Sequence, residues 1–110
     1  LFDASFCCMA DSQEEALPCD VSDFPVDESP YGVRHMAGLM SEWTSSAWNP
    51  YGPKIENERL TVEKAELDDD RVIRGGYWED YPRRLRLACR DDGSVFFRDN
   101  YLGFRLVLSL

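Results

Sequence analysis

Apolar residues occur along this chain in short runs, and each run predicts at most a short regular element. The apolar step at residues 72–73 ends at the glycine pair 75–76, which predicts a short strand closed by a glycine break. Leu60 and Val62 alternate with polar neighbours as in an edge strand. Residues 63–67 favour a helix instead, so the pattern leaves both elements open there.

The first half of the chain predicts little regular structure. Residues 1–10 form an apolar run that fits either a buried strand or the end of a helix. Residues 11–30 are acidic and carry three prolines, which predicts loop or extended chain. The apolar residues between 33 and 40 fall near one helical face, but Gly38 limits any helix to one or two turns.

Arginines and glycines stand beside apolar or aromatic residues in the last third of the chain. Glycine next to an aromatic residue lets the ring pack directly on the backbone. Half-buried guanidinium groups that donate to carbonyls or carboxylates are expected of Arg74, Arg86, Arg90 and Arg105. Glu42 is predicted to be a buried carboxylate that pairs with Arg90 or Arg74, because a buried charge requires a partner.

The chain is acidic, and its charge is unevenly distributed. It has 12 Lys and Arg against 21 Asp and Glu, a formal net charge of −9. Residues 1–30 hold eight acids and no Lys or Arg, while residues 71–110 hold eight arginines against five acids. This balance argues against nucleic acid as a partner, since phosphate contacts need clustered cations. We expect a solvated acidic surface, with attraction to a basic partner or to the C-terminal third as alternatives.

The length of 110 residues allows one domain or part of one, and 44% hydrophobic residues suffice for a packed core. No apolar run reaches the roughly 18 residues that cross a bilayer, so no membrane partner is expected. The chain begins with Leu and lacks the basic start of a signal peptide. We therefore expect a fragment, or the ordered part, of a longer protein.

The four cysteines, Cys7, Cys8, Cys19 and Cys89, follow no recognisable disulfide framework. Adjacent cysteines seldom pair with each other, and the chain has no CxxC motif and a single histidine, so a zinc site is not expected. We expect reduced thiols in a cytoplasmic protein. The adjacent pair has apolar flanks and is expected to be buried and inert.

Two blocks of the sequence resemble the formylglycine-generating-enzyme (sulfatase-modifying factor) domain superfamily. The C-terminal block, residues 71–106, contains RV-RGG-W, a proline, LR-A-R and GFRL; the earlier block, residues 25–44, contains PV, YGV, MAG and EWT at the family's spacing. The resemblance implies an α+β, C-type-lectin-like fold with short antiparallel strands and much irregular structure. The chain would be the C-terminal part of one such domain, divided into a lead-in, the YG–MAG–EWT block, a connection and the RGG–GFR block at residues 1–30, 31–48, 49–70 and 71–110.

The resemblance also implies which copper chemistry is absent. In family members that oxidise a target cysteine to formylglycine, two cysteines bind copper. The corresponding positions fall close to Asp80 and to Leu85 or Arg86, and none of these is cysteine. Cys89 alone cannot supply the two soft ligands of linear Cu(I), so this activity is disfavoured unless one of the three N-terminal cysteines folds against it.

Iron and calcium sites of the family are incomplete in the same way. A second enzymatic branch joins histidine derivatives to sulfur donors with non-haem iron, held by a His-x3-His-x-Glu pattern in a separate helical domain. The single His35 cannot replace that triad. The family's calcium site resembles a Gly-Asn-x-x-Glu motif, in which Leu39 here replaces the Asn, which should weaken or abolish the site. No cofactor or metal is predicted for this chain.

The family framework leaves two polar loops variable, residues 79–84 and 91–98. In related lectin-like domains the exposed surface lies between the GG-aromatic strand and the GFR strand. The expected binding residues are therefore Glu79, Asp80, Tyr81, Arg83 and Arg84, with Asp92, Ser94, Phe96, Phe97 and Arg98. The expected framework is Glu42, Trp43, Arg74, Gly75, Gly76, Trp78, Arg86, Arg90, Gly103, Phe104 and Arg105.

Adjacent phenylalanines in a strand cannot both point inward, so one of Phe96 and Phe97 is expected to be exposed. The alternative places Phe96 in the core and Phe97 against a neighbouring domain.

Two functions stay open on these residues. The first is a non-catalytic, lectin-like binding or regulatory module of a larger bacterial protein, which recognises a small ligand, a protein partner or the rest of its parent chain. The second is a copper-dependent formylglycine-generating oxidase, or a non-haem-iron sulfur-transfer enzyme, that is completed by an N-terminal part outside these residues.

Overall fold

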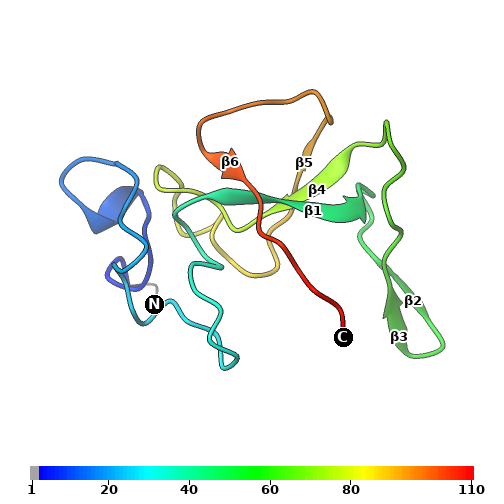
Figure 1. The fold of residues 1–110 in the computed structure, drawn as a ribbon, viewed down its shortest axis with the longest axis horizontal. Helices are drawn as coiled ribbons and strands as arrows, with labels where there is room; N and C mark the ends of the chain where they lie inside the picture. The colour runs from blue at the N-terminus through cyan, green and yellow to red at the C-terminus, as the bar shows by residue number, and fades with distance from the viewer. Residues whose placement is uncertain (1–2) are drawn as a thin grey trace.

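Short strands and irregular chain make up this protein in the computed structural model, which describes residues 3–110 (Figure 1). The regular elements within that range are a 3-10 turn, η1 (Ala10–Ser12), and the strands β1 (Ser41–Ala47), β2 (Lys54–Glu56), β3 (Arg59–Thr61), β4 (Arg71–Arg74), β5 (Asp91–Gly93) and β6 (Leu102–Gly103). No helix among the described residues is long and apolar enough to cross a membrane.

Four of the strands form one sheet in the order β5-β4-β1-β6. β4 is the strand predicted at residues 72–73, and it pairs antiparallel with both β1 and β5. β6 pairs with β1 in parallel, so the expectation of antiparallel strands is wrong for this edge. The parallel pair arises because the chain leaves β5 at one edge of the sheet and loops across to the opposite edge (Figure 1).

β2 and β3 form a separate hairpin that projects from the sheet (Figure 1). Its turn, Asn57 and Glu58, has positive φ at both residues (51° and 62°), the backbone that a two-residue hairpin turn needs. The segment after β3 then runs beside β1, where the Ala47 N–H donates to the Glu63 carbonyl at 2.9 Å. Of the two interpretations left open for this region, the strand is confirmed and the helix is wrong.

Two predicted segments of helix or strand do not form. No helix occurs between residues 33 and 40, because His35, Gly38 and Leu39 all adopt positive φ, which interrupts a right-handed helix. Residues 3–9 of the N-terminal apolar run form turns and bends rather than a strand, followed by η1. Leu1 and Phe2, the rest of that run, lie outside the described residues.

The buried core lies beside the sheet, between the N-terminal segment and the loop that follows β4. One cluster joins Cys7 and Met9 to Leu85, and a second joins Cys8 and Leu39 to Trp78. Trp78 is 5% exposed. The N-terminal segment is thus part of the core although it has no regular structure beyond η1.

At Gly38 three segments of backbone meet. The Gly38 N–H donates to the Gly75 carbonyl at 2.8 Å, and the Leu39 N–H donates to the Cys8 carbonyl at 2.9 Å. A Cβ atom on Gly38 would overlap the Cys8 carbonyl oxygen. The N-terminal segment can approach the glycine pair after β4 only because residue 38 has no side chain.

The expectation of reduced thiols is wrong for two of the four cysteines. Cys8 forms a disulfide with Cys19, across a Cα–Cα distance of 6.2 Å. The intervening loop turns back on itself, a path that the cysteine spacing did not reveal. Cys7 is free and buried as expected, and burial, together with the nearby Asp27 carboxylate, raises the pKa of its thiol to about 11. Cys89 is free and half-buried.

Replacing Gly38 tests the close approach. We expect Gly38→Ala to lower the free energy of unfolding by about 2–5 kcal/mol, since the new methyl group overlaps backbone at a left-handed position. Gly32 is the matched control, because it has a similar φ of 78° but no atom lies within 4 Å of the place where a Cβ would stand. Gly32→Ala should cost only about 1–2 kcal/mol. Equal losses in urea denaturation of the two variants would contradict this account.

Candidate functional site

The two loops expected to bind a partner enclose one hollow of about 340 Å³. Asp80 and Arg84 come from the first loop, and Asp92 and Phe97 come from the second. Tyr77 and Tyr101 complete its wall, together with Asp91 and the buried Ile73 of β4. We call this hollow the loop groove.

Two stacked tyrosines form the aromatic side of the loop groove. The rings of Tyr77 and Tyr101 lie nearly parallel, 15° apart in plane, with centroids 4.0 Å apart. Phe97 tilts toward Tyr101 at 6.5 Å. Burial raises the pKa of both tyrosine hydroxyls, and neighbouring carboxylates add to the shift, so both phenols are neutral at ordinary pH.

Carboxylates tied together by one arginine form the polar side. Asp80 accepts a hydrogen bond from the Tyr77 N–H at 3.1 Å, and Arg84 Nε lies 3.1 Å from its other oxygen. Arg84 also pairs with Asp91. Burial raises the pKa of Asp80, while the Tyr77 N–H and Arg84 oppose this shift. Asp92 takes part in no ion pair within residues 3–110.

The predicted binding residues differ in exposure, and six of them lie outside the loop groove. Asp80 is buried, at 7% exposure, so its predicted place on the open surface is wrong; it binds the backbone of its own turn instead. Phe96 is 78% exposed, which confirms that one of the two phenylalanines faces solvent and contradicts the alternative with Phe96 in the core. The predicted residues that are exposed and do not line the groove are Glu79, Tyr81, Arg83, Ser94, Phe96 and Arg98.

Four residues of the loop groove were not named as binding residues from the sequence: Ile73, which lies in the predicted strand, Asp91, which begins the predicted loop 91–98, and the tyrosines Tyr77 and Tyr101. Tyr77 stands in the GG-aromatic segment and Tyr101 just before the GFR segment, so both belong to stretches with the character of framework. Their positions in the sequence could have indicated a place in the groove, because both tyrosines flank the variable loops. Their stacking depends on how the two loops fold together, which local pattern does not reveal.

Glu42 pairs with a framework arginine, as expected, but the arginine is Arg105, so the choice of Arg90 or Arg74 is wrong; Glu42 is also half-buried rather than buried. Arg105 Nε lies 2.7 Å from Glu42 Oε2, and Arg105 also donates to the carbonyls of Arg34 (2.9 Å) and His35 (3.0 Å). The reason is the parallel register of β6, which places Gly103 beside Glu42. Arg105 follows Gly103 by two residues, and its guanidinium reaches the Glu42 carboxylate.

The other framework arginines donate to carbonyls, as expected. Arg74 Nη1 donates to the Leu87 carbonyl at 2.8 Å, and Arg90 Nη1 donates to the Asn49 carbonyl at 3.0 Å. Arg86 donates to the Arg83 carbonyl but is exposed rather than half-buried. Phe104 was expected to be a framework residue, but it is 73% exposed and is not packed in the core of the described residues.

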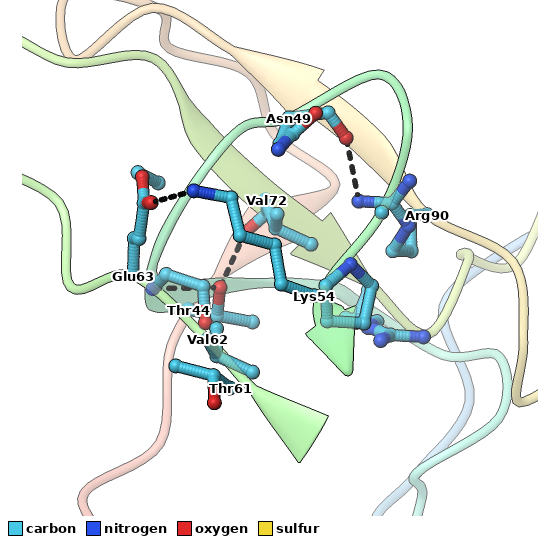
Figure 2. A pocket seen from close by; sticks show the side chains of 13 residues that line it. Thr44, Asn49, Lys54, Thr61, Val62, Glu63, Val72 and Arg90 are labelled. Atoms are coloured by element: carbon cyan, nitrogen blue, oxygen red, sulfur yellow. Dashed lines mark hydrogen bonds and ion pairs between the residues drawn. The ribbon is translucent and has the colours of Figure 1, made fainter. Parts of the chain in front are cut away.

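A second pocket, of about 90 Å³, is lined by residues of β1, β4 and the hairpin region (Figure 2). Successive residues of a strand point to opposite faces, so Val72 borders this pocket while Ile73 borders the loop groove. The hairpin covers the pocket, where Lys54 and Glu63 form an ion pair at 2.9 Å. Arg90 lies inside, 4.8 Å above the ring of Trp48. We call it the hairpin pocket.

Comparison with known families matches residues 2–110 to the family described as "Sulfatase-modifying factor enzyme 1-like domain". The chain belongs to this family. Its membership confirms the predicted family and the C-type-lectin-like, α+β fold class.

Known relatives of this sulfatase-modifying-factor chain are bacterial proteins named hercynine oxygenase. That of Mycolicibacterium smegmatis is 35% identical over 94 residues, 81% of this chain and 22% of that protein. Those of Mycolicibacterium thermoresistibile and Mycobacterium tuberculosis are 33% and 30% identical over similar shares. The chain therefore spans about a fifth of the length of these relatives. No solved structure gave a significant match.

The metal donors within the described residues do not fit a copper pair. Cys8 and Cys19 are bonded to each other, and Cys7 packs with Met9 and Leu85 rather than beside Cys89. Residues 3–110 contain no group of three or more His, Cys, Asp or Glu side chains placed to hold a metal ion. His35 is buried with its Nε2 atom 2.9 Å from the Val21 carbonyl, which occupies one of its two ring nitrogens.

The pKa of Asp80 predicts a pH dependence. The folded protein binds this proton more tightly than the unfolded chain, so its contribution to stability falls as pH rises from the ordinary aspartate pKa through the raised folded value. We expect the difference in unfolding free energy between the parent protein and Asp80→Asn to decrease over that interval and then level off. Urea denaturation at a series of pH values measures it. A difference that does not change with pH would contradict the assignment.

Proposed function

We propose that this chain is the ligand-holding C-terminal part of a larger oxygenase of the hercynine oxygenase type. In this proposal the chain contributes a binding groove, and the metal ligands come from elsewhere in the protein. The proposal keeps the binding role inferred from the variable loops and places it within an enzyme, as the names of the relatives favour.

The observation that carries the proposal is the chemistry of the loop groove. It combines the faces of two stacked tyrosines with three carboxylates and a single arginine. Aromatic faces attract cations, and quaternary ammonium groups in particular are bound by aromatic side chains beside acidic ones. Hercynine is the trimethylammonium betaine of histidine, so its charged end matches this groove.

Each groove residue has a distinct part in this binding. Arg84 holds Asp80 and Asp91 in place through ion pairs. Asp92, which is exposed and unpaired among the described residues, is left to attract the ligand's positive charge. Tyr77 and Tyr101 remain neutral and supply the apolar wall against which the methyl groups pack.

The surface of the chain supports its place in a larger protein. Its accessible surface is 8391 Å², whereas a compact monomer of 12.7 kDa exposes about 6,200 Å². The excess, about 2,000 Å², is the size of an extensive interface. Much of it is apolar, including Phe104, Leu106, Val107 and Leu108, each more than 70% exposed. We infer that further parts of the protein cover these residues.

Formylglycine generation is not part of the proposal. Its copper pair requires two cysteine ligands near each other. Cys89 is free, but Cys8 and Cys19 are bonded to each other and Cys7 packs with Met9 and Leu85.

Ligand binding by the whole protein tests the groove. We expect Asp92→Asn to weaken hercynine binding about 3- to 10-fold, and Tyr101→Leu at least as much, since a desolvated cation over an aromatic ring contributes about 1–2 kcal/mol. Phe96→Ala is the control, because that ring is 78% exposed and outside the groove. Isothermal titration calorimetry measures all three. Unchanged binding in both groove variants, or an equal loss in Phe96→Ala, would remove the assignment.

Metal content tests the other half of the proposal. If the metal ligands lie outside this chain, Cys89→Ser and His35→Gln should leave the metal content of the whole purified protein unchanged. Elemental analysis of the folded variants measures it. Loss of stoichiometric metal in either folded variant would show that this chain supplies a ligand.

A further inference from the structure

Two neighbouring arginines of the hairpin pocket have no acidic partner. Arg74 and Arg90 are both half-buried and both line the pocket. No ion pair joins either of them to a carboxylate within residues 3–110, although the chain contains 21 acidic residues. Arg34, Arg84 and Arg105, by contrast, each pair with a carboxylate.

Most hydrogen-bond donors of these two guanidinium groups are unused. Arg74 employs Nη1 alone, for the carbonyls of Leu87 and Cys89. Arg90 employs Nη1 alone, for the carbonyl of Asn49. A guanidinium carries five N–H donors in a planar fork that matches the two oxygens of a carboxylate. The Nε and Nη2 donors of both residues therefore remain available to a ligand.

The surroundings hold Arg90 in place and make the pocket positive. The guanidinium lies 4.8 Å above the Trp48 ring, which restricts its motion and leaves its edge free. Lys54 is the third cation that lines the pocket, and the single acid, Glu63, is already paired with it. Figure 2 shows this ion pair beside the pocket, with Arg90 on the opposite side. The lining thus has a net positive charge in a chain whose total is −9.

Apolar side chains complete the lining. Val72 of β4 forms part of the floor, and Val62 and Pro53 contribute from the hairpin region. A volume of about 90 Å³ suits a small molecule of a few carbon atoms rather than a nucleotide or peptide. The lining therefore calls for a ligand with one anionic end and a short apolar body.

We propose that the hairpin pocket binds a small organic acid, whose carboxylate is held by Arg74 and Arg90 and whose carbon chain packs against Val62 and Val72. This site is separate from the loop groove, since the two lie on opposite faces of the sheet. Its charge is also opposite, so the two sites select different ligands.

Titration of the whole protein with butyrate, acetate and butylammonium tests the site. We expect saturable binding of butyrate, weaker binding of acetate, because each buried methylene contributes about fourfold, and none of butylammonium. Arg90→Gln should weaken butyrate binding at least about 10-fold, the loss of a charge-assisted hydrogen-bonded pair. Arg59→Gln, on the exposed strand β3 of the same hairpin, should leave it within twofold.

A second variant distinguishes loss of the binding site from misfolding of the protein. Val62 is 55% exposed, so Val62→Glu places a carboxylate at the pocket without removing a structural hydrogen bond. It should abolish butyrate binding, whereas Val62→Gln should retain it. The proposal is overturned if the whole protein shows no saturable binding of butyrate. An acidic side chain from another part of the protein that fills the pocket would give this result. The proposal is also overturned if folded Arg90→Gln binds butyrate as tightly as the parent protein, or if Val62→Glu still binds butyrate.

Discussion

The close approach of three backbone segments at Gly38 is the constraint on which this fold depends. The N-terminal segment packs in the core through Cys7, Cys8 and Met9. Hydrogen bonds from Gly38 to Gly75 and from Leu39 to Cys8 join the glycine pair and the N-terminal segment to the same turn. Unpaired backbone groups at such a buried junction would carry a large desolvation cost. A side chain at residue 38 would separate the segments, and the pairing that fixes the glycine turn after β4 would be lost.

That junction also positions the loop groove. Gly76, the residue after Gly75, has positive φ. Leu85 and Asp80 lie so close to it that a side chain at residue 76 would crowd them. The Ala10 N–H donates to the Asp80 carbonyl, so the N-terminal segment holds the first loop from behind. The Tyr77 N–H donates to the Asp80 carboxylate, and Arg84 links Asp80 to Asp91. These contacts give the irregular chain of the loop groove the rigidity that the proposed ligand binding needs.

The sequence predicted the parts of this protein that depend on local pattern. The strand at residues 72–73 and the glycine break after it follow from local pattern, and the meeting of the two polar loops follows from the family resemblance. The Cys8–Cys19 disulfide, the parallel β6 and the Glu42–Arg105 pair did not, because each depends on how distant segments return to one another. The Tyr77–Tyr101 stack was missed for the same reason. The wrong partner for Glu42 proved informative, since it left Arg74 and Arg90 without carboxylates.

The central claim is that this chain holds the ligand while other parts of the protein supply the metal. An experimental structure of the whole protein with hercynine bound tests it most directly. The account predicts the trimethylammonium group within about 6 Å of the Tyr77 or Tyr101 ring centroid, with Asp92 beside it. Hercynine bound with its ammonium group away from both tyrosines and from the loops 79–84 and 91–98 would contradict it.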